Sequence, residues 1–176
     1  MTFADKVRLT IESVKETVVL DQGGPRFVHA YQLKTQFRLP GAGSTHHGLI
    51  DTGAAFTVLP ESVWKSHEQA LERVTAPPGQ LIPKWLLFVA GLGGGQFSCE
   101  PALVQIQFFD PELRVLKPRR ILVKCARDGG MLKESLIGLG GHVLDECRLE
   151  VEYKASSVDL KEKQPAWLRE MESRHA

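Results

Sequence analysis

The stretch that decides the fold runs from Gly48 to Pro60 and reads GLIDTGAAFTVLP. Within it, Asp51 ends a short apolar strand and is followed by a small hydroxyl residue and then a glycine. An apolar strand resumes at Thr57, so the acid does not belong to a solvated loop. Because a buried carboxylate is costly without a partner, the pattern predicts an acid at the floor of a cavity, with a tight turn beneath it. A second interpretation stays open, in which Asp51 only accepts backbone hydrogen bonds in an Asx turn.

A glycine-rich segment lies further along the chain, where Gly91, Gly93, Gly94 and Gly95 separate two stretches of strand character. Glycines also crowd into phosphate-binding loops, but those loops end in Gly-Lys-Ser/Thr or lead into a helix. Here the last glycine is followed by Gln-Phe and by further strand character. A flexible hairpin tip that folds over bound peptide explains these glycines better than a nucleotide site does.

A third segment, from Ser135 to Gly138, reads SLIG and precedes a predicted short helix at 142–146 and a strand at 148–151. Together with LIDTGA at 49–54 and VAGLGGGQF at 89–97, it resembles the retropepsin-like aspartic peptidases. These are the retroviral proteases and their cellular and bacterial relatives. The three segments are similar to the family's catalytic loop, flap hairpin and apolar-apolar-Gly motif, in the family's order, and the resemblance covers 27–153.

This resemblance implies a mainly β, acid-protease-like barrel, closed or partly closed, with one lobe per chain. It implies an aspartic endopeptidase in which Asp51 is the catalytic carboxylate and Thr52, Gly53 and Ala54 support the catalytic loop. Two carboxylates that share one proton can activate water and protonate the peptide carbonyl without a covalent intermediate. No metal or organic cofactor is implied.

The chain supplies only one such loop, because no second D-T-G or D-S-G is present. Asp110, Asp128 and Asp145 also lie near apolar runs, but they lack the small hydroxyl residue and the glycine. We therefore expect the pair to form from Asp51 of two copies across a twofold axis, in a homodimer. The resemblance gives Thr52 a hydrogen bond across that axis.

The resemblance also assigns roles to glycines around the acid. Gly91 and the run 93–95 are expected to cover an extended peptide substrate, and Gly53 to let the loop backbone donate to the carboxylate. Ile137 and Gly138 are expected beside the site, where a Cβ at 138 would clash with the loop. An ordinary turn glycine remains an alternative for Gly138.

Two residues depart from the family pattern. Retroviral members commonly have an acidic residue soon after the D-T-G-A motif, which holds the substrate backbone, whereas this chain has Ala55 and Phe56 there. We expect these two residues to bind substrate in a more apolar pocket. The main rival hypothesis is a catalytically silent member, used for dimerisation or peptide binding. Another is a peptidase domain recruited to a larger assembly through its C-terminal tail.

The resemblance, which covers 27–153, implies three parts: an N-terminal strand extension at 1–26, the peptidase domain at 27–153, and a charged tail with a possible helix at 154–176. A helix is predicted from Pro60 to about Arg73, and a turn at 21–25. Strands are predicted at 7–11, 27–33, 35–39, 48–50, 85–90, 96–99, 102–109, 119–124, 136–137 and 148–151.

Composition narrows the classes of partner. The net charge is +1 and basic residues are scattered, so neither nucleic acid nor a membrane surface is expected as a partner. No apolar run is long enough for a membrane span, and the N-terminus lacks a signal-peptide pattern. Three cysteines without C-x-x-C spacing favour a reducing cytoplasm. The pair His46-His47 has no ligand partner nearby in sequence, which favours a surface loop over a metal site.

Overall fold

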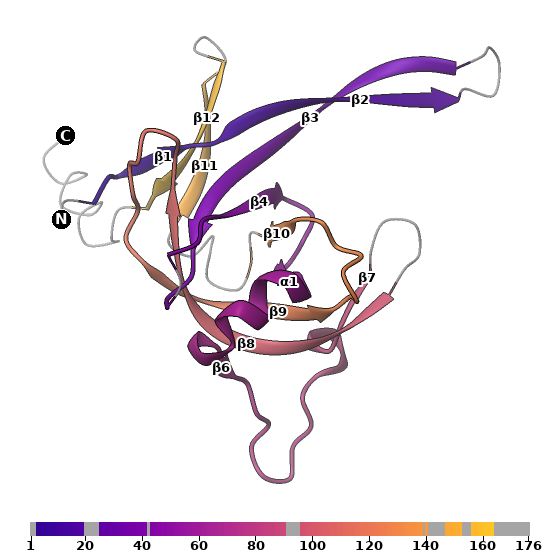
Figure 1. Ribbon diagram of the computed structural model, residues 1–176, viewed down its shortest axis with the longest axis vertical. Coiled ribbons are helices and arrows are strands. Elements are labelled where there is room, and N and C mark those ends of the chain that lie inside the picture. Colours follow the sequence, from indigo (N-terminus) through magenta and orange to yellow (C-terminus); the bar gives the residue numbers. More distant parts are fainter. Residues whose placement is uncertain are drawn as a thin grey trace, which may run out of the picture.

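The computed structural model describes residues 3–19, 25–41, 43–90, 96–138, 140, 147–152 and 156–163, and these form a mainly β structure with one short α-helix (Figure 1). The strands are β1 (Lys6–Arg8), β2 (Thr10–Val19), β3 (Pro25–Arg38), β4 (His46–Asp51), β5 (Thr57–Leu59), β6 (Glu72–Arg73), β7 (Phe88–Ala90), β8 (Gln96–Phe109), β9 (Arg119–Arg127), β10 (Ser135–Gly138), β11 (Cys147–Glu152) and β12 (Ser157–Glu162). The helices are α1 (Glu61–Trp64) and the 3-10 helices η1 (Lys65–Ala70) and η2 (Lys84–Leu86).

The larger sheet closes on itself. Its strand order is β2-β3-β4-β10-β5-β9-β8-β6, with β7 also paired to β8, and a further pairing joins β3 to β8. That pairing aligns Phe37 with Phe108, and both side chains are fully buried. The ring from β3 through β4, β10, β5, β9 and β8 therefore encloses a core of apolar side chains, as alternating strands with one buried face should. The expected barrel of mainly β structure is confirmed.

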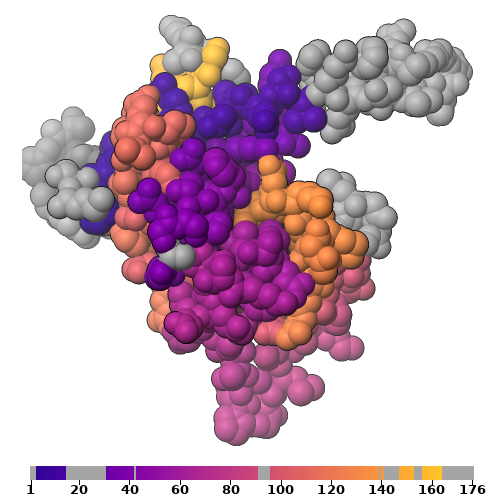
Figure 2. All heavy atoms as spheres, viewed as in Figure 1, coloured from indigo at the N-terminus to yellow at the C-terminus, as the bar shows by residue number. Residues whose placement is uncertain are grey.

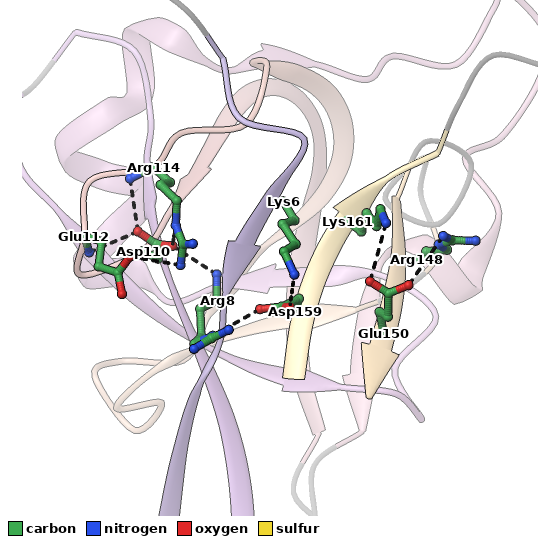
Figure 3. Close-up of polar contacts among 9 residues, drawn as sticks. All are labelled: Lys6, Arg8, Asp110, Glu112, Arg114, Arg148, Glu150, Asp159 and Lys161. Atoms are coloured by element: carbon green, nitrogen blue, oxygen red, sulfur yellow. Dashed lines mark hydrogen bonds and ion pairs between the residues drawn. The ribbon is translucent and has the colours of Figure 1, made fainter. Parts of the chain in front are cut away.

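A smaller sheet, in the order β1-β12-β11, corrects the expectation of a charged tail from residue 154. Strand β12 lies between β1 and β11, and Val158 and Leu160 on it are buried in the core. Asp159 between them is also buried, but it binds Lys6 and Arg8 of β1 (Figure 3). Because its charged residue is neutralised by partners on a neighbouring strand, this segment forms a strand despite its polar composition. The helix predicted beyond residue 165 lies outside the described residues.

The predicted helix at 60–73 is shorter than expected. It ends after Trp64, continues as a 3-10 turn with a kink at His67, and gives way to the edge strand β6, which pairs with β8. Pairing with the sheet outweighs local helical preference here, because Trp64, His67 and Leu71 are all buried by this path. The chain at 85–90 likewise begins as a 3-10 turn before β7, and the two strands predicted within 96–109 are one strand, β8.

Two features extend from the barrel. Strands β2 and β3 pair in continuous antiparallel register and reach beyond the body in Figure 1. The segment that links β6 to η2 also projects, as Figures 1 and 2 show, and it carries Leu81, which is 93% exposed. The turn predicted at 21–25 and the helix predicted at 142–146 lie largely outside the described residues.

Candidate active site

The loop at residues 52–56 joins two strands that are not neighbours. Strand β10 lies between them, parallel to β4 and antiparallel to β5. In this register Ile137 is opposite Ile50, and Gly138 is opposite Asp51. The buried side chains of Ile50 and Ile137 hold the two strands against the core. The loop must therefore cross over the end of β10, and this crossing sets the position of the Asp51 carboxylate.

The crossing is tight, and two glycines allow it. A Cβ at Gly138 would lie 2.8 Å from the backbone N of Phe56 and closer still to the Phe56 carbonyl. A Cβ at Gly140 would overlap the carbonyl oxygen of Ala55. Because backbone atoms cannot move aside as a flexible side chain can, any larger residue at these positions would displace the loop. The loop thus packs directly against two positions that only glycine can occupy.

Asp51 stands at the edge of this crossing. Its Oδ1 accepts a hydrogen bond from the backbone N of Gly53 at 2.9 Å, and its carbonyl accepts one from the N of Ala54 at 3.2 Å. The Asp51 side chain is half-buried, whereas Thr52 and Gly53 are exposed. The Asx interaction is thus present, but it uses one oxygen, and no donor to Oδ2 is found in the described part of the chain.

A pocket of about 170 Å³ adjoins the loop. Its lining comes from the loop, β5, β7 and β9: Ala54, Ala55, Phe56, Val58, Phe88, Val89, Ala90 and Lys124. The Phe56 ring stacks on Trp85, with ring centroids 5.3 Å apart and planes 22° from parallel. Trp85 is 57% exposed and Phe88 is 42% exposed, so aromatic surface lies open beside Phe56 of the loop. This arrangement suits contact with an extended peptide.

The pocket is less apolar than Ala55 and Phe56 alone suggested. Lys124, which the sequence reasoning missed, reaches it from β9, and burial lowers the pKa of its ammonium group. Its position within the apolar run ILVKCA at 121–126 was the available signal, because an ionisable residue in a buried strand needs a reason. Trp85, Phe88 and Val89 were also missed as site residues.

The structure brings most of the predicted site residues together. Residues 51–56 form the loop, and Ile137 and Gly138 lie beneath or beside it on β10. Gly91, Gly93, Gly94 and Gly95 lie outside the described residues. The strands that flank them, β7 and β8, pair up to Ala90 and Gln96, and β7 contributes to the pocket.

The other acids considered in the sequence have structural partners. Asp128 is 1% exposed and accepts hydrogen bonds from the backbone N of Glu61 at 2.8 Å and of Leu132 at 2.7 Å. Asp110 is equally buried and accepts from several donors. Asp145 lies outside the described residues. Neither described acid faces the pocket beside the loop.

The histidine pair differs from the expected surface loop. His46 begins β4 and is half-buried, and its Nε2 lies 2.8 Å from Nε2 of His67, which donates through Nδ1 to the carbonyl of Pro40. His47 points to the exposed side. Among the described residues, no three His, Cys, Asp or Glu side chains gather closely enough to hold a metal ion. No helix in the described ranges has the length and apolar character required to cross a membrane.

No protein-family model matches the chain, and no curated protein matches it in sequence. Among solved structures, the chain is similar to a retropepsin-like aspartic protease from Rickettsia conorii, with a TM-score of 0.45 and 11% sequence identity. The match covers 88% of this chain and 95% of that chain. Membership of a family is therefore a proposal here, and it stands on the motifs and on the geometry of the loop.

Proposed function

We propose that this chain is a single-lobed aspartic endopeptidase of the retropepsin-like type, which works as a homodimer. The observation that carries the proposal is the Asp51 loop. The half-buried Asp51 carboxylate accepts a hydrogen bond from Gly53 N at one oxygen. The loop that follows it packs against two positions that only glycine can occupy, and the same loop lines a pocket. A carboxylate that served only the turn would not need the adjoining pocket or the tight support from β10.

The proposed chemistry uses two copies of Asp51. Like charges a few ångströms apart cannot both ionise readily, so the pair holds one proton between them. The ionised carboxylate removes a proton from water, which attacks the peptide carbonyl, while the protonated one donates to the carbonyl oxygen. Collapse of the tetrahedral intermediate then breaks the C–N bond, and the amine leaves with a proton.

Exposure of the loop tip supports the dimer. Thr52 and Gly53 are exposed in the single chain, directly beside the carboxylate. In the proposed dimer the Thr52 hydroxyl hydrogen-bonds to the partner's loop and fixes the distance between the two acids. An isologous contact of this kind places the same residue of both copies at the axis, which a chain with one D-T-G requires.

The substrate in this proposal is an extended peptide. It lies between the Asp51 loop and the β7–β8 hairpin, whose glycines at 91–95 cover it. The exposed rings of Trp85 and Phe88 offer it an apolar contact surface. The rival, a peptide-binding module without catalysis, uses the same surface and differs only in the fate of the peptide.

The test is cleavage of a diverse peptide library by the purified chain between pH 3 and 9, with Asp51→Asn as the matched variant. We expect a bell-shaped pH dependence with its maximum on the acidic side of neutrality, since the pair fails when both acids are ionised or both protonated. Chelators should have no effect. Activity retained by Asp51→Asn, activity that rises steadily to pH 9, or activity carried by a strict monomer would contradict the proposal.

A further inference from the structure

Lys124 occupies a position where a charge is unexpected. Strand β9 alternates, and Ile121, Val123 and Cys125 point into the main core. Lys124 belongs to the opposite face, with Ala126, and its direct neighbour across the parallel pair is Val58 of β5. The residue is only 8% exposed. The ammonium group of Lys124 is thus nearly buried on the side of β9 that lines the pocket beside the Asp51 loop.

The charge of Lys124 has dipoles around it but no counter-ion among the described residues. Its Nζ donates to the carbonyl oxygen of Phe88 at 2.9 Å and to that of Trp85, and it lies 5.3 Å from the centroid of the Phe56 ring. No carboxylate of the described residues lies within ion-pair distance of it. A buried ammonium without a carboxylate is costly, and carbonyls and a ring face compensate only part of that cost.

The pocket combines this cation with apolar side chains. Apart from Lys124, every lining residue is apolar, and three of them, at 54–56, belong to the loop that begins with Asp51. A ligand group that enters the pocket therefore lies against residues 54–56, which follow the proposed reacting carboxylate in the chain. A neutral side chain in this pocket would bury the ammonium further without pairing it, whereas a carboxylate would supply the missing partner.

We propose that this pocket binds the acidic side chain, Asp or Glu, of a peptide substrate, and that Lys124 is the residue that determines this specificity. The inference rests on the proposed peptidase function for its kinetic readout. The side chain passes between the aromatic and aliphatic walls, and its carboxylate meets the one N–H of Lys124 that the Trp85 and Phe88 carbonyls leave over. Discrimination follows because a site built around a polar group rejects a substrate that leaves that group unpaired.

The kinetic test takes a cleaved peptide from the library and compares Glu, Gln, Leu and Lys at each position in turn. At one position we expect kcat/KM for Glu to exceed that for Gln by about tenfold or more. Lys124→Met removes the charge at similar length and should abolish this preference or reverse it toward Gln and Leu. Lys84→Met is the matched control, because Lys84 is an exposed neighbour of Trp85 outside the pocket, and it should leave the preference unchanged.

The variant is expected to fold, because Met has a similar length and its introduction removes the cost of burying a charge that no described carboxylate pairs. Circular dichroism and the unfolding midpoint check this, and Lys124→Arg, which keeps the charge, should retain a preference for acidic over neutral side chains. Equal use of Glu and Gln by the wild type, or a Glu preference that survives in Lys124→Met, overturns the inference while the peptidase function stands.

A binding experiment separates this inference from the proposed function. Calorimetry of library peptides that differ only by Glu or Gln at one position, chosen without regard to cleavage, measures binding to the pocket of the Asp51→Asn variant without chemistry. If no peptide is cleaved by the wild type, yet Glu peptides bind about tenfold more tightly than Gln peptides and only with Lys124 present, the peptidase proposal fails and the pocket assignment holds. If the Glu peptides bind no better than the Gln peptides, or bind not at all, the pocket assignment is wrong.

Discussion

Two aspartates at the ends of strands have very different surroundings: Asp51 is the last residue of β4, and Asp110 directly follows β8. Asp110 is 1% exposed and accepts hydrogen bonds from the backbone N of Arg8, Glu112 and Arg114 at 3.0–3.1 Å. It also binds the Arg114 guanidinium at 2.7 Å (Figure 3). The Asp51 side chain is half-buried, and its carboxylate accepts one hydrogen bond from the described residues, donated by the backbone N of Gly53.

The difference separates a carboxylate with several donors from one with a single donor among the described residues. Burial by itself would raise the pKa of Asp110, but the hydrogen bonds from Arg8 and Arg114 outweigh it and the pKa is lowered. Every oxygen of Asp110 is occupied, so this carboxylate ties the turn at 110–114 to β1. Within the described part of the chain, Oδ2 of Asp51 has no donor, which leaves it available for the water molecule and the second carboxylate of the proposed mechanism.

The largest expected difference between the two aspartates is in the activity of their Asn variants. Asp51→Asn should lower peptide hydrolysis by about 10³-fold or more, because an amide can act neither as the base nor as the acid of the pair. Asp110→Asn should leave the activity per folded molecule near that of the wild type. Initial rates on one cleaved peptide, normalised to folded protein, provide the measurement. Similar losses in both variants would mean that Asp51 has no special role.

The second effect is on the free energy of unfolding, and here Asp110→Asn should have the larger effect of the two variants. Asp110→Asn should lower the free energy of unfolding by about 2–3 kcal/mol, because it removes a charge that several buried donors share. Asp51→Asn should change it by less than about 0.5 kcal/mol, since Asn can still accept from Gly53. Urea unfolding followed by tryptophan fluorescence measures both. An Asp110→Asn variant as stable as the wild type would contradict the structural role.

The third effect concerns the residue beside Asp51. Thr52→Val should weaken the proposed dimer by about 1–3 kcal/mol, since the exposed hydroxyl is expected to bond across the axis. Thr57→Val is the matched control, because the Thr57 Oγ1 is buried and has no hydrogen-bond partner among the described residues. Sedimentation equilibrium should show a changed dimer constant only for Thr52→Val. An unchanged constant in that variant would remove Thr52 from the interface.

The smallest effect is on the pH dependence of stability. Asp159 resembles Asp110, since burial would raise its pKa but hydrogen bonds from Lys6 and Arg8 lower it (Figure 3). A lowered folded pKa gives stability that is fully present above the unfolded value of about 3.9 and is lost as the pH falls through the folded pKa. The contribution of Asp159 to the urea midpoint should therefore be level from about pH 7 to 5 and be lost below about pH 4.

The contribution of Asp110 to this decline can be isolated. Asp110→Asn should show a shallower fall in the urea midpoint between about pH 4 and 2, because the remaining dependence comes from Asp159 and other carboxylates. A fall as steep as that of the wild type would show that Asp110 has the same pKa in the folded and unfolded chains.

The sequence predicted the parts of the molecule in which a local pattern has one physical meaning. Alternation along β8 and β9 and the apolar run before Asp51 identified the barrel strands, and the glycine at 138 indicated a close approach. Strand β12 was missed because its charges are neutralised by β1, which lies more than a hundred residues away in sequence. The helix boundary after Trp64 depended in the same way on a distant strand, β8.

The candidate site was predicted in part for the same reason. The loop at 51–56 is one continuous motif, so its chemistry could be predicted from the residues alone. Lys124 comes from another strand, and nothing local to β9 says which face of the barrel meets the pocket. Ala55 and Phe56 therefore suggested an apolar pocket, whereas the structure adds a cation to it.

The crossing of the loop over β10 has a consequence for synthesis of the chain. Strands β4 and β5 leave the ribosome early, but the strand that must lie between them, β10, emerges only after Gly138 has been made. Contacts of such large sequence separation form late, because the entropy of closing the intervening chain must be overcome first. The Asp51 loop thus gains its support only when the barrel is nearly complete. A nascent chain would hold no assembled Asp51 loop beside neighbouring unfolded polypeptide.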